Sequence, residues 1–173
     1  MADGVSKPVA LPLSRQHDRI DFSCGNATLD RYLKEFALQD ARRRIAAPFV
    51  AVFESAPDKI CGYYTLSAYA VRLGELPDSL AKRLPSYPRL PATLLGRLAV
   101  DLRHQGQSLG EFLLIDALNR AFEQSARIGA AAVVVDAIDD NAVAFYRHFG
   151  FLSLADAPRR LFLPMRDVAV LFK

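Results

Sequence analysis

The chain has few of the residues that build covalent or metal-bound frameworks. It contains 2 cysteines and 3 histidines among 173 residues, and Cys24 and Cys61 are far apart, with no Cys-x-x-Cys pair. This spacing indicates neither a zinc site nor a disulfide framework, so we expect no metal and a reducing, cytoplasmic setting. The 22 Lys and Arg against 19 Asp and Glu leave a net charge of +3, which only mildly suggests an anionic partner.

Long apolar runs are also missing. The residues up to Asp18 lack the apolar run of a signal peptide, and no stretch approaches the roughly 18 uncharged apolar residues that span a bilayer. We therefore expect a soluble protein without a membrane role. Because 51% of the residues are hydrophobic, the chain can bury a sizeable core, and we predict one globular domain over residues 1–173.

Hydrophobic periodicity predicts a mixed α/β fold. Helical spacing runs over 27–43, behind Asn26 or Thr28 as a possible N-cap. Two runs rich in Val, Tyr and Thr, at 49–53 and 60–71, predict an antiparallel hairpin.

The prolines that follow the hairpin predict an irregular insert over 74–91, with one short helix near 78–83. The remaining elements expected are a buried strand at 94–101, a helix from Leu109 to about Phe122, a buried strand at 131–138, a helix at 141–148 that Gly150 ends, and strands near 151–154 and 160–165.

The turn between the strand at 94–101 and the next helix is a candidate anion site. A glycine turn that enters a helix presents unpaired backbone N–H groups at the positive end of the helix dipole. A P-loop is excluded because Glu111 follows Gly110, and the spacing Gly-x-Gly-x-x-Gly is absent. The letters match Arg-x-x-Gly-x-Gly/Ala, read from Arg103 to Ser108. The alternative is a turn that only connects strand to helix.

A second constellation is DAIDDNAVAFYRHFGF, from Asp136 to Phe151. It places Tyr146 on a short helix that follows a buried strand. A phenol, with a reference pKa of about 10, can act as a general acid toward a leaving group of similar basicity. The alternative is that Phe145, Tyr146 and Phe149 form an aromatic packing edge.

Both segments resemble the GNAT superfamily of N-acetyltransferases, the first its pyrophosphate-binding turn and the second the segment after its fifth strand. The resemblance implies a central mixed, mostly antiparallel sheet with splayed fourth and fifth strands, flanked by helices. It implies acetyl-CoA as cofactor and Tyr146 as the general acid that protonates the departing thiolate. The implied cofactor contacts are Leu98, Ala99, Val100, Arg103, Gln105, Gly106, Gln107, Ser108, Leu109, Gly110, Asn141 and Phe145.

Two features complicate this assignment. Ser108 departs from the family pattern, which has Gly or Ala there, although its N–H remains available to a phosphate. No general base is evident. Asp136, Asp139 and Asp140 are candidates by location, but such a charge run is also typical of a solvated turn.

Motifs along nearly the whole chain are similar to the GNAT toxins of bacterial toxin-antitoxin pairs. They are HDRIDFSCGNATLDRYL, GYYTLS, the proline-rich insert, LGRLAVD and DNAVAFYRHFGF. This resemblance implies acetylation of the free amino group of aminoacyl-tRNA, inhibition of translation, neutralisation by a ribbon-helix-helix antitoxin, and a homodimer.

Clustered basic residues agree with an RNA substrate, since phosphate contacts provide affinity with little sequence reading. The candidates are Arg42, Arg43, Arg44, Lys82, Arg83 and Arg89. Residues 42–44 equally fit a role in complementing a helix dipole. Two other functions stay open: acetylation of a small amine or a protein N-terminus, and a non-catalytic CoA-binding or RNA-binding module.

Overall fold

The computed structural model describes residues 6–172, which form two compact units. The first comprises the residues up to Leu66 together with Arg97–Ala117, and the second Ser67–Gly96 together with the residues from Leu118 onward. Strands β3 (Gly62–Arg72) and β4 (Arg89–Val100) and helix α4 (Leu109–Ser125) each run from one unit into the other. The assignment of residues 1–173 to one domain stays a prediction.

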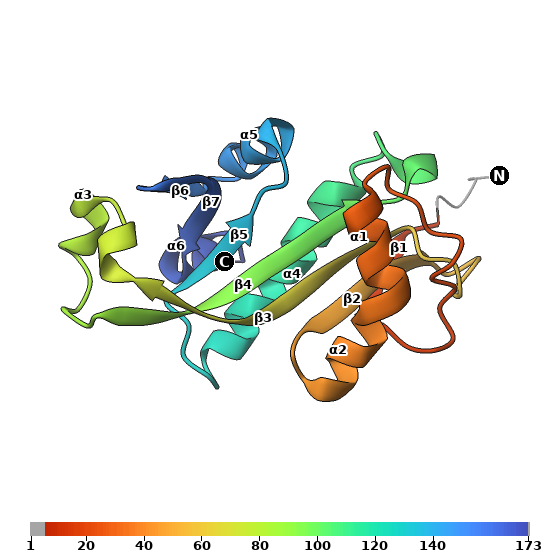
Figure 1. Ribbon diagram of the computed structural model, residues 1–173, viewed down its shortest axis with the longest axis horizontal. Coiled ribbons are helices and arrows are strands. Elements are labelled where there is room, and N and C mark those ends of the chain that lie inside the picture. Colours follow the sequence, from red (N-terminus) through yellow and green to blue (C-terminus); the bar gives the residue numbers. More distant parts are fainter. Residues whose placement is uncertain (1–5, 173) are drawn as a thin grey trace. The chain divides into compact units, whose positions relative to one another are not determined.

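The strands follow the order β1-β2-β3-β4-β5-β7-β6 in a seven-stranded sheet (Figure 1). The ladders β1–β2, β2–β3, β5–β7 and β6–β7 are antiparallel, and β4–β5 is parallel. The predicted mixed α/β class, with a mostly antiparallel sheet flanked by helices, is confirmed.

The first unit contains a meander of β1 (Pro8–Pro12), β2 (Ala47–Phe53) and the start of β3. Pro8 faces Phe53 in the first ladder, and Ala47 faces Leu66 in the second. The hairpin is confirmed. Strand β1 was not predicted, because the prolines at both its ends indicated a short irregular leader segment. The structure places β1 at the sheet edge, where a missing N–H is tolerated.

The predicted helix over 27–43 forms with a change of pitch in the middle. It consists of α1 (Ala27–Arg31), the π-helical η1 (Tyr32–Phe36) and α2 (Ala37–Arg43). The side chain of Asn26 caps its start by accepting a hydrogen bond from the Leu29 N–H at 3.1 Å. Arg44 ends it in the left-handed conformation, with φ 59°.

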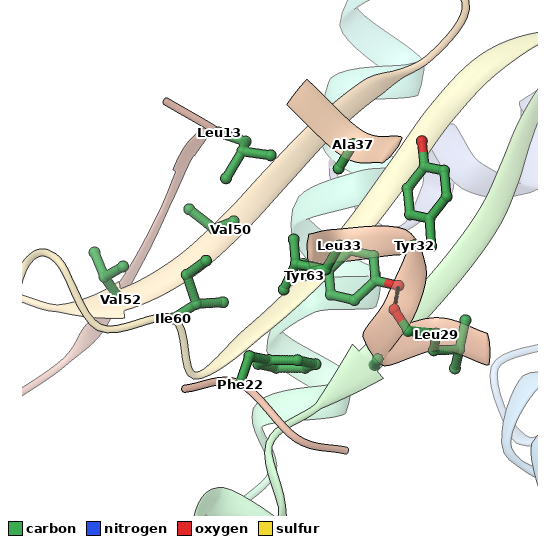
Figure 2. Packing of buried hydrophobic residues seen from close by; sticks show 11 residues of the cluster. Leu13, Phe22, Leu29, Tyr32, Leu33, Ala37, Val50, Val52, Ile60 and Tyr63 are labelled. Atoms are coloured by element: carbon green, nitrogen blue, oxygen red, sulfur yellow. Dashed lines mark hydrogen bonds between the residues drawn. The ribbon is translucent and has the colours of Figure 1, made fainter. Parts of the chain in front are cut away.

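A cluster of buried side chains joins this helix to the meander (Figure 2). Leu33 and Val50 are completely buried, and the ring of Phe22 packs edge-on against Tyr63. The Tyr63 hydroxyl donates a hydrogen bond to the Leu29 carbonyl at 2.7 Å (Figure 2). The polar end of this buried ring is thereby satisfied, as a well-packed core requires.

The second unit is organised around β5 (Ala132–Asp136), which pairs with β4 on one side and β7 (Ala157–Pro164) on the other. The parallel ladder runs from the pair Ala92 and Ala132 to the pair Leu95 and Val135. It ends there although β4 continues to Val100, as expected of strands that splay apart.

The other elements mostly follow the predicted ones. They are η2 (Leu73–Glu75), α3 (Asp78–Ala81), η3 (Leu102–His104), α5 (Asp140–His148), β6 (Leu152–Leu154) and α6 (Met165–Val170). Helix α6 was not predicted. Strand β4 begins at Arg89 rather than Leu94, because the prolines around its first residues indicated an irregular insert. Within residues 6–172, no helix is long and apolar enough to cross a membrane.

Candidate active site

The turn of the first unit has the backbone shape of an anion site. Gly106 and Ser108 take the left-handed conformation, with φ 79° and 62°, and α4 begins at Leu109. The Ser108 carbonyl accepts from the Phe112 N–H at 3.1 Å, which starts the helical hydrogen bonding. The first N–H groups of a helix have no intrahelical acceptor, so those of Leu109 and Gly110 are donors at the positive end of a 17-residue helix.

A buried carboxylate anchors the residues that precede the turn. The Asp101 side chain is 2% exposed and accepts hydrogen bonds from the Ser23 N–H at 3.1 Å and the Arg103 N–H at 2.9 Å. It also forms an ion pair with Arg103, whose Nε lies 2.9 Å from Oδ1. The opposite end of the guanidinium contacts Asp21 at 2.9 Å. Arg103 is therefore held by two carboxylates although its side chain is 52% exposed, and its assignment to the cofactor stays a prediction.

These contacts determine the protonation of Asp101. Burial alone would raise the pKa of this carboxyl, but the hydrogen bonds from Arg103 and from the Ser23 N–H outweigh it and lower the pKa to about 2. Asp101 is thus a charged structural residue at physiological pH. Its connection to Asp21 through Arg103 could not be predicted, because Asp21 is distant along the chain.

Further contacts hold β4 and the turn together. The Gln105 side chain donates to the Val100 carbonyl at 3.0 Å and the Cys24 carbonyl at 3.1 Å. On β3, a Cβ at Gly62 would lie 2.8 Å from a methyl group of Leu113 and 3.0 Å from the Ala99 carbonyl oxygen, so a larger residue would force these neighbours to shift. Gln105 was predicted to contribute its amide to the cofactor, and its side chain has this structural role.

Replacing Ser108 by glycine is expected to stabilise the protein. A side chain in the left-handed conformation costs roughly 1–2 kcal/mol, part of which is offset by the greater freedom of glycine in the unfolded chain. We expect Ser108→Gly to raise the free energy of unfolding by about 0.5–1 kcal/mol, measured by urea denaturation. Because the N–H is kept, CoA binding measured by calorimetry should not weaken.

Ser86→Gly is the matched control, since Ser86 lies in a loop and has no positive φ. It should show no gain in stability. Equal stabilisation by both substitutions would contradict strain at Ser108.

The segment that carries Tyr146 belongs to the second unit. The Asp139 side chain caps α5 by accepting from the Ala142 N–H at 2.8 Å. Gly150, with φ 94°, ends the helix, and the Phe151 N–H donates back to the Tyr146 carbonyl at 3.2 Å. The motif therefore determines both ends of α5. The spacing of its aromatic residues has a packing role in addition to any catalytic role.

Tyr146 combines an apolar setting with one nearby charge. Its ring lies edge-on to Phe145 and Phe151, with centroids 5.2 and 5.5 Å apart, and the residue is 5% exposed. Burial, reinforced by the negative charge of Asp136, raises the pKa of the Tyr146 phenol. Among residues 6–172, no hydrogen bond engages its hydroxyl. The phenol is therefore protonated at neutral pH and has a proton to donate.

Asp136 lies in a charged cluster that sequence reasoning did not find. Arg160 on β7 pairs with it at 2.7 Å from Nε to Oδ1, and donates from Nη1 to the Tyr69 hydroxyl at 2.6 Å. Of the three base candidates, Asp136 is thus bound to arginine, Asp139 caps α5, and Asp140 is exposed and lies 3.5 Å from Arg159. None of the three is assigned as the base.

The other candidate residues are distributed over both units. The segment from Leu98 to Gly110 belongs to the first unit, whereas Asn141 and Phe145 lie on α5 of the second. The six basic residues predicted to contact RNA are all exposed. Arg44 also ends a helix, which agrees with a structural role for at least one of the three consecutive arginines.

The chain belongs to the acetyltransferase (GNAT) family, whose model matches residues 15–151. It is accordingly an acetyl-CoA-dependent N-acetyltransferase. The resemblance drawn from the turn and the tyrosine segment is thereby confirmed at the level of the family.

Particular relatives resemble the chain over almost its full length. It is 35% identical to a "tRNA-acetylating toxin" of Mycobacterium tuberculosis, over 92% of this chain and 93% of that protein. The solved structure of AtaT complexed with acetyl-methionyl-tRNAfMet has a TM-score of 0.88 and 28% identity, covering 96% and 100% of the two chains. A tyrosine-to-phenylalanine mutant of AtaT bound to the C-terminus of the antitoxin AtaR has a TM-score of 0.82 and 25% identity, covering 96% and 98%.

Proposed function

We propose that this protein is a toxin that transfers acetyl from acetyl-CoA to the free amino group of aminoacyl-tRNA and so inhibits translation. The observation that carries the proposal is the similarity to a tRNA-acetylating toxin over more than nine tenths of both chains. The solved AtaT complex supports the same acceptor, because it holds an acetylated aminoacyl-tRNA.

In the proposed reaction, the amine nitrogen attacks the thioester carbonyl carbon, and the carbon–sulfur bond breaks. The thiolate takes a proton from the Tyr146 phenol. The acylated nitrogen releases its proton to solvent, and solvent returns a proton to the phenolate. The amides of residues 105–110 bind the pyrophosphate, the main chain of 98–100 pairs with the pantetheine arm as an added strand would, and Asn141 and Phe145 contact the cofactor. An aminoacyl ester has a lower amine pKa than lysine, which reduces the need for a dedicated base.

The wider assignments belong to the same proposal. The two units act as one GNAT domain over residues 1–173, supported by the three elements that run through both. The protein works in the cytoplasm as a homodimer and is neutralised by a ribbon-helix-helix antitoxin. AtaT binds the C-terminus of the antitoxin AtaR, which supports an antitoxin as the partner of this chain.

The proposal is tested with labelled acetyl-CoA and a total pool of charged tRNA. We expect label on charged tRNA only, with deacylated tRNA as the control, and we expect transfer to weaken steeply as salt rises because phosphate contacts release counterions. Label on deacylated tRNA, or transfer to a small amine with no labelling of charged tRNA, would contradict it.

The exposed arginines at the end of α2 provide a second measurement. Arg43→Gln should reduce the slope of log affinity for tRNA against log salt by about one, as expected for one lost phosphate contact. Arg127→Gln, another exposed arginine outside the predicted RNA contacts, is the matched control and should leave the slope unchanged. An equal effect of both variants would remove Arg43 from the RNA site.

A further inference from the structure

The second unit contains a cavity whose lining includes neither Tyr146 nor any residue assigned to the cofactor. Its volume is about 200 Å³, and β3, the proline-rich insert, β4, β5, β7 and α6 all contribute to its wall. Phe162 on β7 and Leu90 on β4 line it and are themselves buried, with 1% and 7% exposure. The interior is therefore apolar and supported by the core of the unit.

The insert covers this cavity with a regular row of leucines. Leu76, Leu80 and Leu84 follow one another at four-residue spacing through α3 and its flanking turns, and all three line the cavity. Only Leu80 lies within α3; Leu76 precedes it in an extended conformation and Leu84 follows it, so helix and flanking turns together place these side chains at the cavity. Small ligands bind in concave, mostly apolar sites with a few polar groups at the edge, so this hollow is a candidate ligand site.

The cavity also has positive charge at its edge. Arg83 follows α3, Arg166 lies on α6, and both line the cavity while remaining exposed. Long arginine side chains of this kind cover an apolar wall with the stem and keep the guanidinium in water. Within residues 6–172, no carboxylate forms a salt bridge with Arg83, and Arg166 has only a 4.0 Å contact with its neighbour Asp167.

We propose that this cavity binds a small apolar monocarboxylate, of the class of medium-chain fatty acids. The hydrocarbon chain would lie among the leucines of the insert, and the carboxylate would bind Arg83 and Arg166. Guanidinium groups form charge-assisted hydrogen bonds with carboxylates, and an apolar body removes the leucine side chains from water. The site contains neither Tyr146 nor any residue assigned to the cofactor, and it shares Arg83 with the predicted RNA contacts.

The test is calorimetric titration of the full chain with octanoate, and with octan-1-ol as the uncharged probe of the same length. We expect saturable octanoate binding with a Kd at least tenfold lower than that of octan-1-ol. Arg83→Gln and Arg166→Gln should each weaken octanoate binding about tenfold and leave octan-1-ol binding unchanged. Arg89→Gln, an exposed arginine of the same region that does not line the cavity, is the matched control and should have no effect.

Methyl NMR of the unsubstituted chain locates the ligand without relying on any variant. Octanoate should shift the methyl signals of Leu80 and Leu84 and leave those of Leu29, in the core of the first unit, unchanged. Equal affinity for the alcohol, an equal loss in Arg89→Gln, or no saturable binding would overturn the proposal. A dimer that persists at high octanoate concentration, measured by light scattering, with no shift of the Leu80 and Leu84 methyl signals would also overturn it, because a second copy of the chain would then occupy the cavity.

Discussion

Replacing Tyr146 by phenylalanine is expected to lower kcat by about two orders of magnitude or more, the usual contribution of a positioned general acid. The substitution removes only the hydroxyl, which makes no hydrogen bond within residues 6–172, and keeps the edge-on packing against Phe145 and Phe151. The KM for acetyl-CoA should therefore change little. The measurement is thiol release from acetyl-CoA in the presence of charged tRNA.

Tyr87→Phe is the matched control, because Tyr87 is 64% exposed and lies outside the site. Circular dichroism of both variants checks that folding is preserved. A Tyr146→Phe enzyme that keeps more than about a tenth of kcat would show that the phenol is not the acid. Because the pKa of Tyr146 is raised, the phenol stays protonated at pH 8 and 9. We therefore expect that deprotonation of Tyr146 will not lower kcat over this pH range.

Replacing Asp101 by asparagine is expected to cost about 2 kcal/mol in the free energy of unfolding near neutral pH. Asparagine loses the charge and one of the acceptor oxygens that bind Ser23 and Arg103, while the site remains buried. We take a value below that typical of a fully buried ion pair, because the Arg103 side chain is 52% exposed and water screens its charge.

The effect should depend on pH with a definite sign. The pKa of Asp101 falls from its ordinary value of 3.8 to about 2 on folding, so its stabilisation is complete above about pH 4 and is lost as the pH falls through 2. Denaturant titrations should therefore show a difference between the native chain and Asp101→Asn that shrinks to less than about 1 kcal/mol at pH 2.

Asp21→Asn is the control for this prediction. It removes the other carboxylate that contacts Arg103. The Asp21 side chain is 54% exposed, so we expect the free energy of unfolding to fall by less than about 1 kcal/mol. A difference for Asp101→Asn that stays constant from pH 7 to pH 2, or an equal loss in Asp21→Asn, would contradict the role assigned to the buried carboxylate.

Elements with a local signal could be predicted from the sequence. The spacing of apolar residues indicated the helix over 27–43 and the helix that carries Tyr146, and the β-rich runs indicated the hairpin. Gly106 and Gly150 marked the two turns that enter and leave helices, and both have positive φ. The two motifs therefore identified the family, because their residues are close along the chain.

Elements that depend on distant partners could not be predicted. Strand β1 exists because it pairs with the edge of β2. In β4, Ala92 and Thr93 pair with β5, although Pro91 just before them breaks the local pattern. No local sequence pattern indicates the π-helical turn or the left-handed conformation of Ser108. In each case, pairing and packing outweigh local propensity.

The sequence by itself determined the helices, the buried strands and the two motifs, since each depends on periodicity or on residues within a few positions of one another. Only the tertiary structure joined Asp21 to Arg103 and Tyr69 to Arg160, and only it placed the leucines of the insert around a cavity. Charge pairing and burial act through space between segments far apart in the chain, so their outcome is decided only when those segments fold together.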